Sequence, residues 1–196
     1  MGDTVKMLFF AGSARAGSYN KQLARLGALI AEANGIEATF ADLEDYPMPL
    51  YNGDDEAIAG APENAVQFKN LMAEHDAIFI ACPEYNASIT ALLKNTLDWV
   101  SRVNAPEPSG KQVFKTRVFA LGAASPGGMG GLRGLTDVRH VLELGLGALV
   151  LPDQFALPRT AEAFDTDGHL KNKDSQEMLK ALIQRAAHTA RVLRGA

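Results

Sequence analysis

Five short apolar runs alternate along this chain with longer stretches of helical spacing, and this alternation constrains the fold more than any other feature. The runs are rich in Val, Ile and Phe, and they predict β-strands at Thr4–Phe10, Ile36–Ala41, Ala77–Cys82, Phe114–Gly122 and Ala148–Leu151. The intervening and following stretches predict α-helices at Asn20–Ala33, Glu63–Glu74, Ile89–Val103, Leu132–Leu144 and Asp174–Leu193. Strands that alternate with helices are typical of βαβ units, which join parallel strands.

The predicted fold is therefore α/β: a doubly wound five-stranded parallel sheet of order 2-1-3-4-5, with helices on both faces. The first, third and fourth runs are almost continuously apolar, as central strands must be when helices cover both sides of the sheet. A length of 196 residues fits a single domain, 1–196. Ligands of such sheets bind beyond the carboxyl ends of the strands, so the segments after each strand are the candidate site.

Composition excludes several classes of function. The net charge of −4 argues against a general nucleic-acid binder. The longest apolar runs fall short of the roughly 18 residues of a membrane span, and the first ten residues lack the pattern of a signal peptide, so we expect a cytoplasmic protein. Cys82 is the only cysteine, which rules out an internal disulfide, and the four histidines lack metal-binding spacing, so no metal is expected.

The segment GSARAGSYN, residues 12–20, joins the first strand to the first helix. Such a turn presents free backbone N–H groups and the positive end of the helix dipole to an anion. Ser13, Arg15, Ser18 and Asn20 add donors suited to phosphate oxygens. Ser18 stands where a triphosphate-binding loop has its lysine, so a terminal monophosphate fits better. The alternative is that Ser18 or Asn20 is an ordinary N-cap and that Arg15 is merely solvated.

Two more polar turns follow the third and fourth strands. The first contains a carboxylate, an aromatic ring and an amide within one tetrad, and the second is unusually rich in glycine. Glycine is costly to order, so a cluster favours close approach of the backbone to a ligand, although a flexible loop is the alternative. We expect the two turns to form the walls of a slot for a flat ring: Pro83, Glu84, Tyr85 and Asn86 on one side, and Ser125–Gly131 on the other.

In these three motifs the sequence resembles the NADPH-dependent FMN reductase family of flavodoxin-like proteins, which includes quinone, chromate and azo-dye reductases. The segment GSARAGSYN matches the family's phosphate loop, PEYNASITALLKNTLDW matches its second motif, and SPGGMGGLR resembles its third. The resemblance implies that Ser13, Arg15, Ser18 and Asn20 contact the FMN phosphate. It also implies that residues 83–86 line the isoalloxazine, and that Ser125, Gly127, Gly128 and Gly130 meet its pyrimidine side.

The function implied by this resemblance is an FMN-dependent NAD(P)H oxidoreductase. NADPH or NADH would pass a hydride to N5 of the flavin, and backbone N–H groups of Ser125–Gly130 would stabilise negative charge at the N1 and O2 edge. Quinones, azo compounds, chromate or free flavin would accept the electrons, and no protein group is assigned a catalytic role. Two alternatives remain open, an FMN electron carrier reduced by a partner protein and a non-enzymatic sensor of a phosphate ester.

For several side chains near these motifs the sequence is consistent with more than one role. Glu84 could donate a proton, or it could hold its turn by accepting backbone N–H bonds. Arg133, Arg139 and His140 could attract the phosphates of NADPH, pair with a neighbouring subunit or form a solvated face. Family resemblance implies a homodimer or homotetramer, and the candidates for its surface are Tyr85, Trp99 and the segment Pro47–Tyr51.

Overall fold

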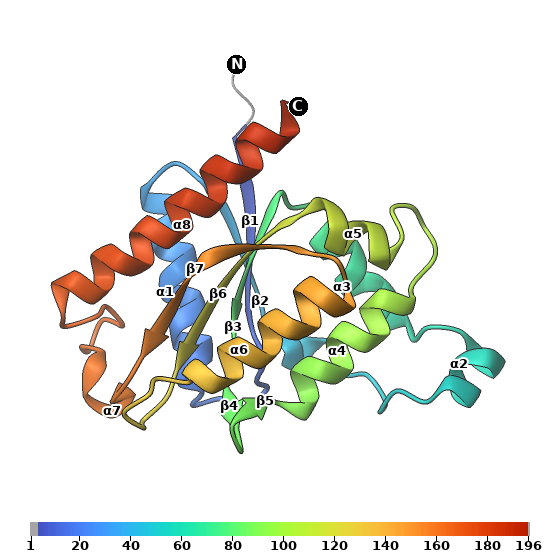
Figure 1. The fold of residues 1–196 in the computed structure, drawn as a ribbon, viewed down its shortest axis with the longest axis horizontal. Helices are drawn as coiled ribbons and strands as arrows, with labels where there is room; N and C mark the ends of the chain where they lie inside the picture. Colours follow the sequence, from blue (N-terminus) through green and yellow to red (C-terminus); the bar gives the residue numbers. More distant parts are fainter. Residues whose placement is uncertain (1–3, 196) are drawn as a thin grey trace.

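The computed structural model describes residues 4–195 and places one parallel sheet between two layers of helices (Figure 1). The sheet consists of β1 (Lys6–Ala11), β2 (Glu37–Ala41), β3 (Ala77–Ala81), β6 (Val118–Ala124) and β7 (Leu149–Leu157). The helices are α1 (Tyr19–Ala33), α2 (Gly53–Ala59), α3 (Glu63–Ala73), α4 (Ala91–Arg102), α5 (Gly110–Thr116), α6 (Leu132–His140), α7 (Thr160–Ala163) and α8 (Lys173–Arg194). Shorter elements are η1 (Leu43–Asp45), η2 (Val141–Gly145) and the hairpin strands β4 (Glu84–Tyr85) and β5 (Ser88–Ile89).

The strand order of the sheet is β2-β1-β3-β6-β7, and every neighbouring pair is parallel. These five strands correspond to the five predicted ones, so the predicted order and fold class are confirmed. Both described ends of the chain lie at the edge of the sheet where the strands begin, and the β4-β5 hairpin lies at the opposite edge (Figure 1). All five strands therefore point their carboxyl ends toward the same rim.

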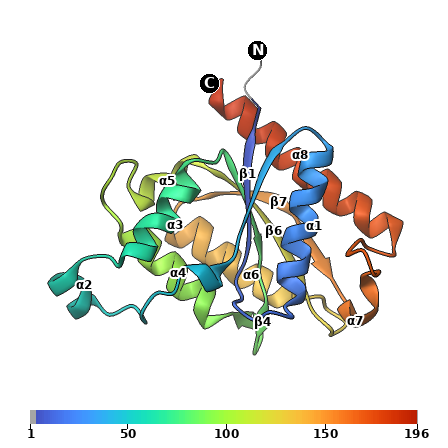
Figure 2. The ribbon, with the colours of Figure 1, turned by 180° about the vertical axis from the view of Figure 1, so that it is seen from behind.

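Successive side chains of the strands pack alternately into two hydrophobic cores, one on each face of the sheet. Met7 and Phe9 of β1 pack with α1 and α8 on one face, whereas Leu8 and Phe10 pack with α3, α4, α5 and α6 on the other. The two views of the ribbon show these helical layers on opposite sides of the sheet (Figures 1 and 2). Because both faces are covered, the central strands are buried along almost their whole length.

The fourth predicted strand began too early. Residues 110–116 form α5 instead, and β6 begins at Val118. A capping box starts this helix: the Ser109 hydroxyl accepts the backbone N–H of Gln112, and the Gln112 side chain accepts that of Ser109. Phe114 is buried in the helix and stacks on Phe119, with 5.9 Å between the ring centroids, so its apolar character reflects helix packing rather than a strand.

The last strand extends six residues beyond its predicted end at Leu151. β7 lies at the edge of the sheet, where Pro152 is tolerated because no further strand needs its missing N–H. A register shift between Phe119 and Leu121 accommodates the extra length. As a result β7 reaches the carboxyl rim, where Leu157 pairs with Ala124.

The segment between β2 and α3 forms a projecting arm, residues 47–61, that contains α2 and has no buried residue in that helix (Figures 1 and 2). Trp99 of α4 anchors the base of the arm, because its indole Nε1–H donates to the carbonyl of Pro49 at 2.7 Å and its ring packs edge-on against Tyr51. Trp99 is only 1% exposed, so the prediction that it belongs to an open dimer surface was wrong.

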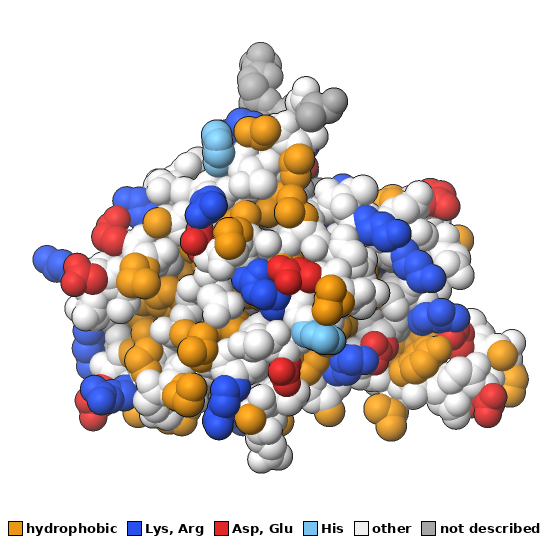
Figure 3. Space-filling view, viewed as in Figure 1, with side chains coloured by type: hydrophobic (Ala, Val, Ile, Leu, Met, Phe, Trp, Pro, Cys, Tyr) orange, Lys and Arg blue, Asp and Glu red, His pale blue; other side chains and the backbone are white. Residues whose placement is uncertain are grey.

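The outer surface seen in Figure 3 mixes charges of both signs with apolar side chains and carries no broad basic field on this face. None of the helices among residues 4–195 is both long enough and apolar enough to cross a membrane.

Candidate functional site

The loop between β1 and α1 turns its carbonyl oxygens toward protein donors. Thr90 Oγ1 donates to the carbonyl of Gly12 at 2.7 Å, and Lys21 Nζ donates to that of Ala14 at 2.9 Å. The carbonyl of Arg15 accepts the backbone N–H of Ser18 at 3.1 Å. A loop that binds an anion must present N–H groups and keep its carbonyl dipoles turned away. These three bonds produce that polarity.

Ser18 is the N-cap of α1, as the structural alternative proposed, because its Oγ accepts the backbone N–H of Lys21. Capping uses only the acceptor side of the hydroxyl, so its O–H remains able to donate to a ligand. Ser13 is 7% exposed and its Oγ accepts the N–H of Arg15 in the same way. The guanidinium of Arg15 is exposed and forms no hydrogen bond or ion pair within residues 4–195.

Asn20 joins the loop between β1 and α1 to the end of β6. Its Nδ2 donates to the carbonyl of Ala124 at 2.8 Å, and its Oδ1 accepts the N–H of the same residue at 2.9 Å. Asn20 is 5% exposed, so both bonds are shielded from water. The side chain predicted to contact phosphate is thus already engaged in holding the first and third motifs side by side.

The second motif, PEYN, forms a tight hairpin at the rim. β4 and β5 pair antiparallel through Tyr85 and Ser88, and the two residues between them both have positive φ, 52° at Asn86 and 69° at Ala87. This is the backbone of a type I′ turn, in which asparagine is common but alanine is strained. Tyr85 is 57% exposed and projects from the hairpin edge of the site.

Replacing Ala87 by glycine should stabilise the protein. The left-handed conformation costs an L-residue with a Cβ about 1–2 kcal/mol, part of which is offset by the greater freedom of glycine in the unfolded chain. We expect Ala87→Gly to raise the free energy of unfolding by about 0.5–1 kcal/mol in urea denaturation. The control is Ala181→Gly in the exposed middle of α8, which should lower it by about 1 kcal/mol. A loss of stability in Ala87→Gly would contradict the strain at this turn.

Glu84 ties this hairpin to α6. Its Oε2 accepts the backbone N–H groups of Arg133 at 3.2 Å and Gly134 at 3.3 Å, and its Oε1 accepts Nε of Arg133 at 2.8 Å. Burial alone would raise the pKa of Glu84, but the bonds from Arg133 and Gly134 outweigh it and hold the pKa below its usual value. Glu84 does accept backbone N–H bonds, as the structural role requires, but it takes them from α6 rather than from its own turn.

The pH dependence of stability should report this contact. Because the folded-state pKa of Glu84 is lowered, its contribution is fully present above the ordinary carboxyl pKa of about 4.3 and is lost as the pH falls through the folded value. We expect Glu84→Gln to unfold with about 1 kcal/mol less free energy at pH 7. This difference should shrink as the pH falls through the lowered pKa of Glu84 in the folded protein. Urea curves of equal midpoint at pH 7 would show that the contact contributes nothing.

Three basic residues of α6, Arg133, Arg139 and His140, differ in their partners. Arg133 is paired with Glu84, which offsets its positive charge. Arg139 pairs with Glu143 at 2.6 Å and donates to the carbonyl of Leu151 at 2.7 Å, which fastens α6 to β7 within one subunit. His140 is exposed at the end of α6.

The glycine-rich loop is fastened by the chain that follows β7. The backbone N–H of Ser125 donates to the carbonyl of Leu157 at the end of β7, at 3.0 Å. The N–H of Thr160 donates to the carbonyl of Ser125, and that of Arg159 to the carbonyl of Gly127, both at 3.3 Å. No motif signalled that this segment would border the site. A Cβ at Gly130, whose φ is +63°, would lie 2.9 Å from the backbone of β7, so this position requires glycine. A Cβ at Gly128 would meet nothing within 4 Å, which leaves open space beside the loop.

The three motifs meet in one cleft of about 100 Å³. It brings together eight of the predicted residues: Ser13, Arg15, Ser18, Asn20, Pro83, Glu84, Tyr85 and Ser125. Tyr19, Ala124 and Pro126 complete the lining, whereas Asn86, Gly127, Gly128 and Gly130 lie outside it. The single carboxylate of this lining, Glu84, is neutralised by Arg133, and the unpaired cation is Arg15. The donor set therefore fits the phosphate of a small ligand such as FMN.

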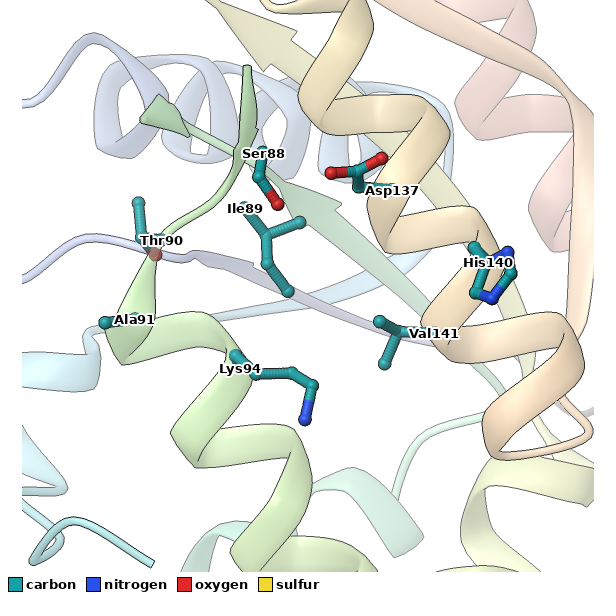
Figure 4. Close-up of a pocket in the computed structure, with 8 residues that line it drawn as sticks. All are labelled: Ser88, Ile89, Thr90, Ala91, Lys94, Asp137, His140 and Val141. Carbon is teal, nitrogen blue, oxygen red and sulfur yellow. The ribbon is translucent and has the colours of Figure 1, made fainter. Parts of the chain in front are cut away.

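A second and larger groove of about 610 Å³ lies behind the hairpin, between α4 and α6 (Figure 4). Ile89 and Val141 line its opposite sides, with Ser88 and Asp137 at one end and Lys94 at the other. The motifs that follow β1 and β6 take no part in it. Its polar groups are also partly committed, because Lys94 pairs with Asp98 at 2.7 Å. We therefore place the candidate site in the smaller cleft, where the residues predicted to contact phosphate lie.

Comparison with known proteins gives a consistent match. The sequence pattern of the NADPH-dependent FMN reductase family covers residues 5–162. An NAD(P)H-dependent FMN reductase of Pseudomonas aeruginosa is 34% identical over the full length of both chains. An NAD(P)H:quinone oxidoreductase of Solanum tuberosum is 31% identical over 97% of this chain and 95% of its own. Among solved structures, FerB, a flavoenzyme NAD(P)H:(acceptor) oxidoreductase of Paracoccus denitrificans, superposes with a TM-score of 0.78 at 25% identity, covering 95% of this chain and 97% of its own.

Proposed function

Because this chain belongs to the NADPH-dependent FMN reductase family, we propose that it is an FMN-dependent NAD(P)H oxidoreductase that passes two electrons to quinones or similar flat acceptors. The observation that carries the proposal is the convergence of three separate motifs on one cleft at the carboxyl rim of the sheet. Relatives named as quinone reductases support the class of acceptor.

The cofactor phosphate binds at the loop of residues 12–18. The carbonyls of Gly12 and Ala14 face protein donors and leave backbone N–H groups for the anion. The hydroxyls of Ser13 and Ser18 would add donors, and Arg15 would supply the positive charge. Residues 83–86 of the hairpin and the loop of Ser125, Gly127, Gly128 and Gly130 would hold the isoalloxazine between them.

FMN, when bound, supplies hydride acceptance and two-electron transfer. The residues of this chain position it and adjust its electrostatics. Within Ser125–Gly130, the N–H groups of Ser125, Gly127 and Gly130 are bonded inside the protein. The backbone N–H groups of Gly128 and Met129 would therefore stabilise negative charge on the pyrimidine side of the ring. Glu84 stays ionised and bound to Arg133 and α6, so it holds the hairpin wall in place rather than exchanging a proton.

The proposal is tested by anaerobic stopped-flow mixing of the FMN-loaded protein with NADPH or NADH. A reductase bleaches the flavin absorbance within seconds, and a quinone added afterwards restores it. A flavin that stays oxidised with both nicotinamides would favour an electron carrier served by a partner protein. Protein that gains no flavin absorbance from added FMN would refute the proposal. Steady-state rates with quinones, azo compounds and chromate then rank the acceptors.

The assembly we propose is a homodimer or homotetramer. The projecting arm exposes Leu50 by 80% and Ile58 by 86%, and Tyr85 is exposed at the rim. Apolar side chains raised on such an arm favour a protein interface. Light scattering should give twice or four times the 20.9 kDa of one chain. Ile58→Asp should reduce this mass, whereas a monomeric wild-type protein would contradict the assembly.

The cellular location we propose is the cytoplasm. The single cysteine, Cys82, is buried, and burial raises its pKa to about 12, so it stays a thiol. This agrees with a reducing compartment, where the nicotinamide donors are also found. Fractionation of cells that express the tagged protein tests this location directly.

A further inference from the structure

Lys21 is an almost fully buried cation in the first turn of α1, beside the loop proposed to bind the cofactor phosphate. Its side chain is 2% exposed. Lysine is rarely buried without specific partners, because removing an ammonium group from water is costly. Neither motif matching nor the resemblance assigned this residue a role.

The ammonium group of Lys21 has three acceptors from two different loops. It lies 2.9 Å from the carbonyl of Ala14, 2.7 Å from Asp42 Oδ1 and 3.3 Å from Glu44 Oε2. Ala14 lies in the phosphate loop, whereas Asp42 and Glu44 follow β2. Lys21 thus bridges the first motif to the neighbouring end of the sheet.

Two carboxylates offset the charge of Lys21, so its effect on an anion must be mainly geometric. Asp42 is itself held by Arg25, whose NH2 lies 3.6 Å from Asp42 Oδ2. The carbonyl of Ala14 would otherwise be free to turn toward the cleft, where its negative end would oppose a phosphate. Thr90 performs the equivalent task at the carbonyl of Gly12.

We propose that Lys21 is a positioning residue of the cofactor-phosphate cradle: it holds the Ala14 carbonyl out of the cleft so that the loop presents donors to the phosphate of FMN. The proposal rests on the proposed function, because it takes FMN as the ligand. Lys21 contributes to the affinity for the phosphate and not to the affinity for the flavin ring.

Riboflavin separates these two contributions, because it carries the same ring without the phosphate. We expect Lys21→Met to raise the Kd of FMN about tenfold, because a released Ala14 carbonyl would oppose the phosphate at a cost similar to that of one charge-assisted hydrogen bond. The Kd of riboflavin should change by less than about twofold, since its ring contacts remain. Fluorescence titration of the flavin-free protein measures both constants. Lys21→Arg keeps a cationic donor and should recover part of the lost FMN affinity.

Lys69 provides the matched control. It is also fully buried and donates through Nζ to a backbone carbonyl, that of Pro106 at 2.5 Å, but it lies in α3 and its acceptor lies outside the loop of residues 12–18. Lys69→Met should lower the Tm and leave the ratio of the FMN and riboflavin constants at its wild-type value. A purely structural role for Lys21 would give the same result as this control.

The outcomes separate this proposal from the proposed function. A wild-type protein that binds neither flavin refutes the function, whereas an unchanged ratio of the two constants in a folded Lys21→Met variant refutes only the role of Lys21. Equal FMN and riboflavin affinities in the wild-type protein would also refute it. If Lys21→Met unfolds, Lys21→Gln takes its place, because it removes the ammonium group but keeps a polar side chain beside Asp42. An unchanged ratio in that variant again overturns the proposal.

Discussion

Arg15→Ala is expected to weaken FMN binding by about 1.5–3 kcal/mol, or roughly 10- to 150-fold in Kd. Arg15 is the cation of the cleft that has no partner among the described residues, so its guanidinium is free to form charge-assisted bonds with phosphate oxygens. The fold should be unaffected, since the side chain is exposed and forms no hydrogen bond or ion pair with the described residues. Fluorescence titration of flavin-free protein measures the change.

Arg191→Ala is the control for net charge, because Arg191 is an exposed residue near the end of α8. It should leave the FMN affinity within about twofold of wild type. Added salt offers a second check. The wild-type affinity should fall with ionic strength more steeply than that of Arg15→Ala, since the variant has lost one charge contact. Equal affinities of wild type and Arg15→Ala would remove Arg15 from the cradle.

Asn20→Ala is expected to lower the free energy of unfolding by about 2–4 kcal/mol, the largest effect on stability that we predict. The substitution leaves the N–H and the carbonyl of Ala124 buried without their partner. Each unsatisfied group costs about 1–3 kcal/mol, only partly relieved if water enters. For a chain of this size the Tm should fall by about 4–16 °C.

The FMN affinity of Asn20→Ala should fall as well, because the phosphate loop and the glycine-rich loop lose the bond that holds them together. Asn34, at the opposite end of α1, is the control: it is exposed, and its side chain bonds to Ile30 and Gln184 rather than to β6. Asn34→Ala should cost less than about 1 kcal/mol. A cost below 1 kcal/mol for Asn20→Ala itself would mean that the bridge to Ala124 is not formed in solution.

The strands and their order could be predicted because their signals are local. Continuous apolar runs mark β1 and β3, and alternation with helices sets the parallel order. The capping box of Ser109 and Gln112 has a recognisable sequence pattern. The apolar residues that follow it were nevertheless interpreted as the beginning of a strand. Periodicity over so few residues does not separate a short helix from a strand.

The interactions within the site could not be predicted, because they join residues far apart in sequence. Asn20 and Ala124 are 104 residues apart, and only the folded chain shows that the amide of Asn20 is used there. Lys21 would ordinarily be counted as a surface residue. The left-handed conformation of Ala87 could not be predicted either, because the residue expected at such a position is glycine.

The central claim is that residues 12–18 hold the phosphate of FMN at the carboxyl rim while the ring lies between the PEYN hairpin and the glycine-rich loop. A crystal structure of the protein with FMN tests it most directly. We predict phosphate oxygens within hydrogen-bonding distance of Ser13, Arg15 and Ser18, with the ring beside Tyr85 and Ser125. FMN bound elsewhere, such as in the groove between α4 and α6, or crystals that take up no FMN at saturating concentration, would contradict the account.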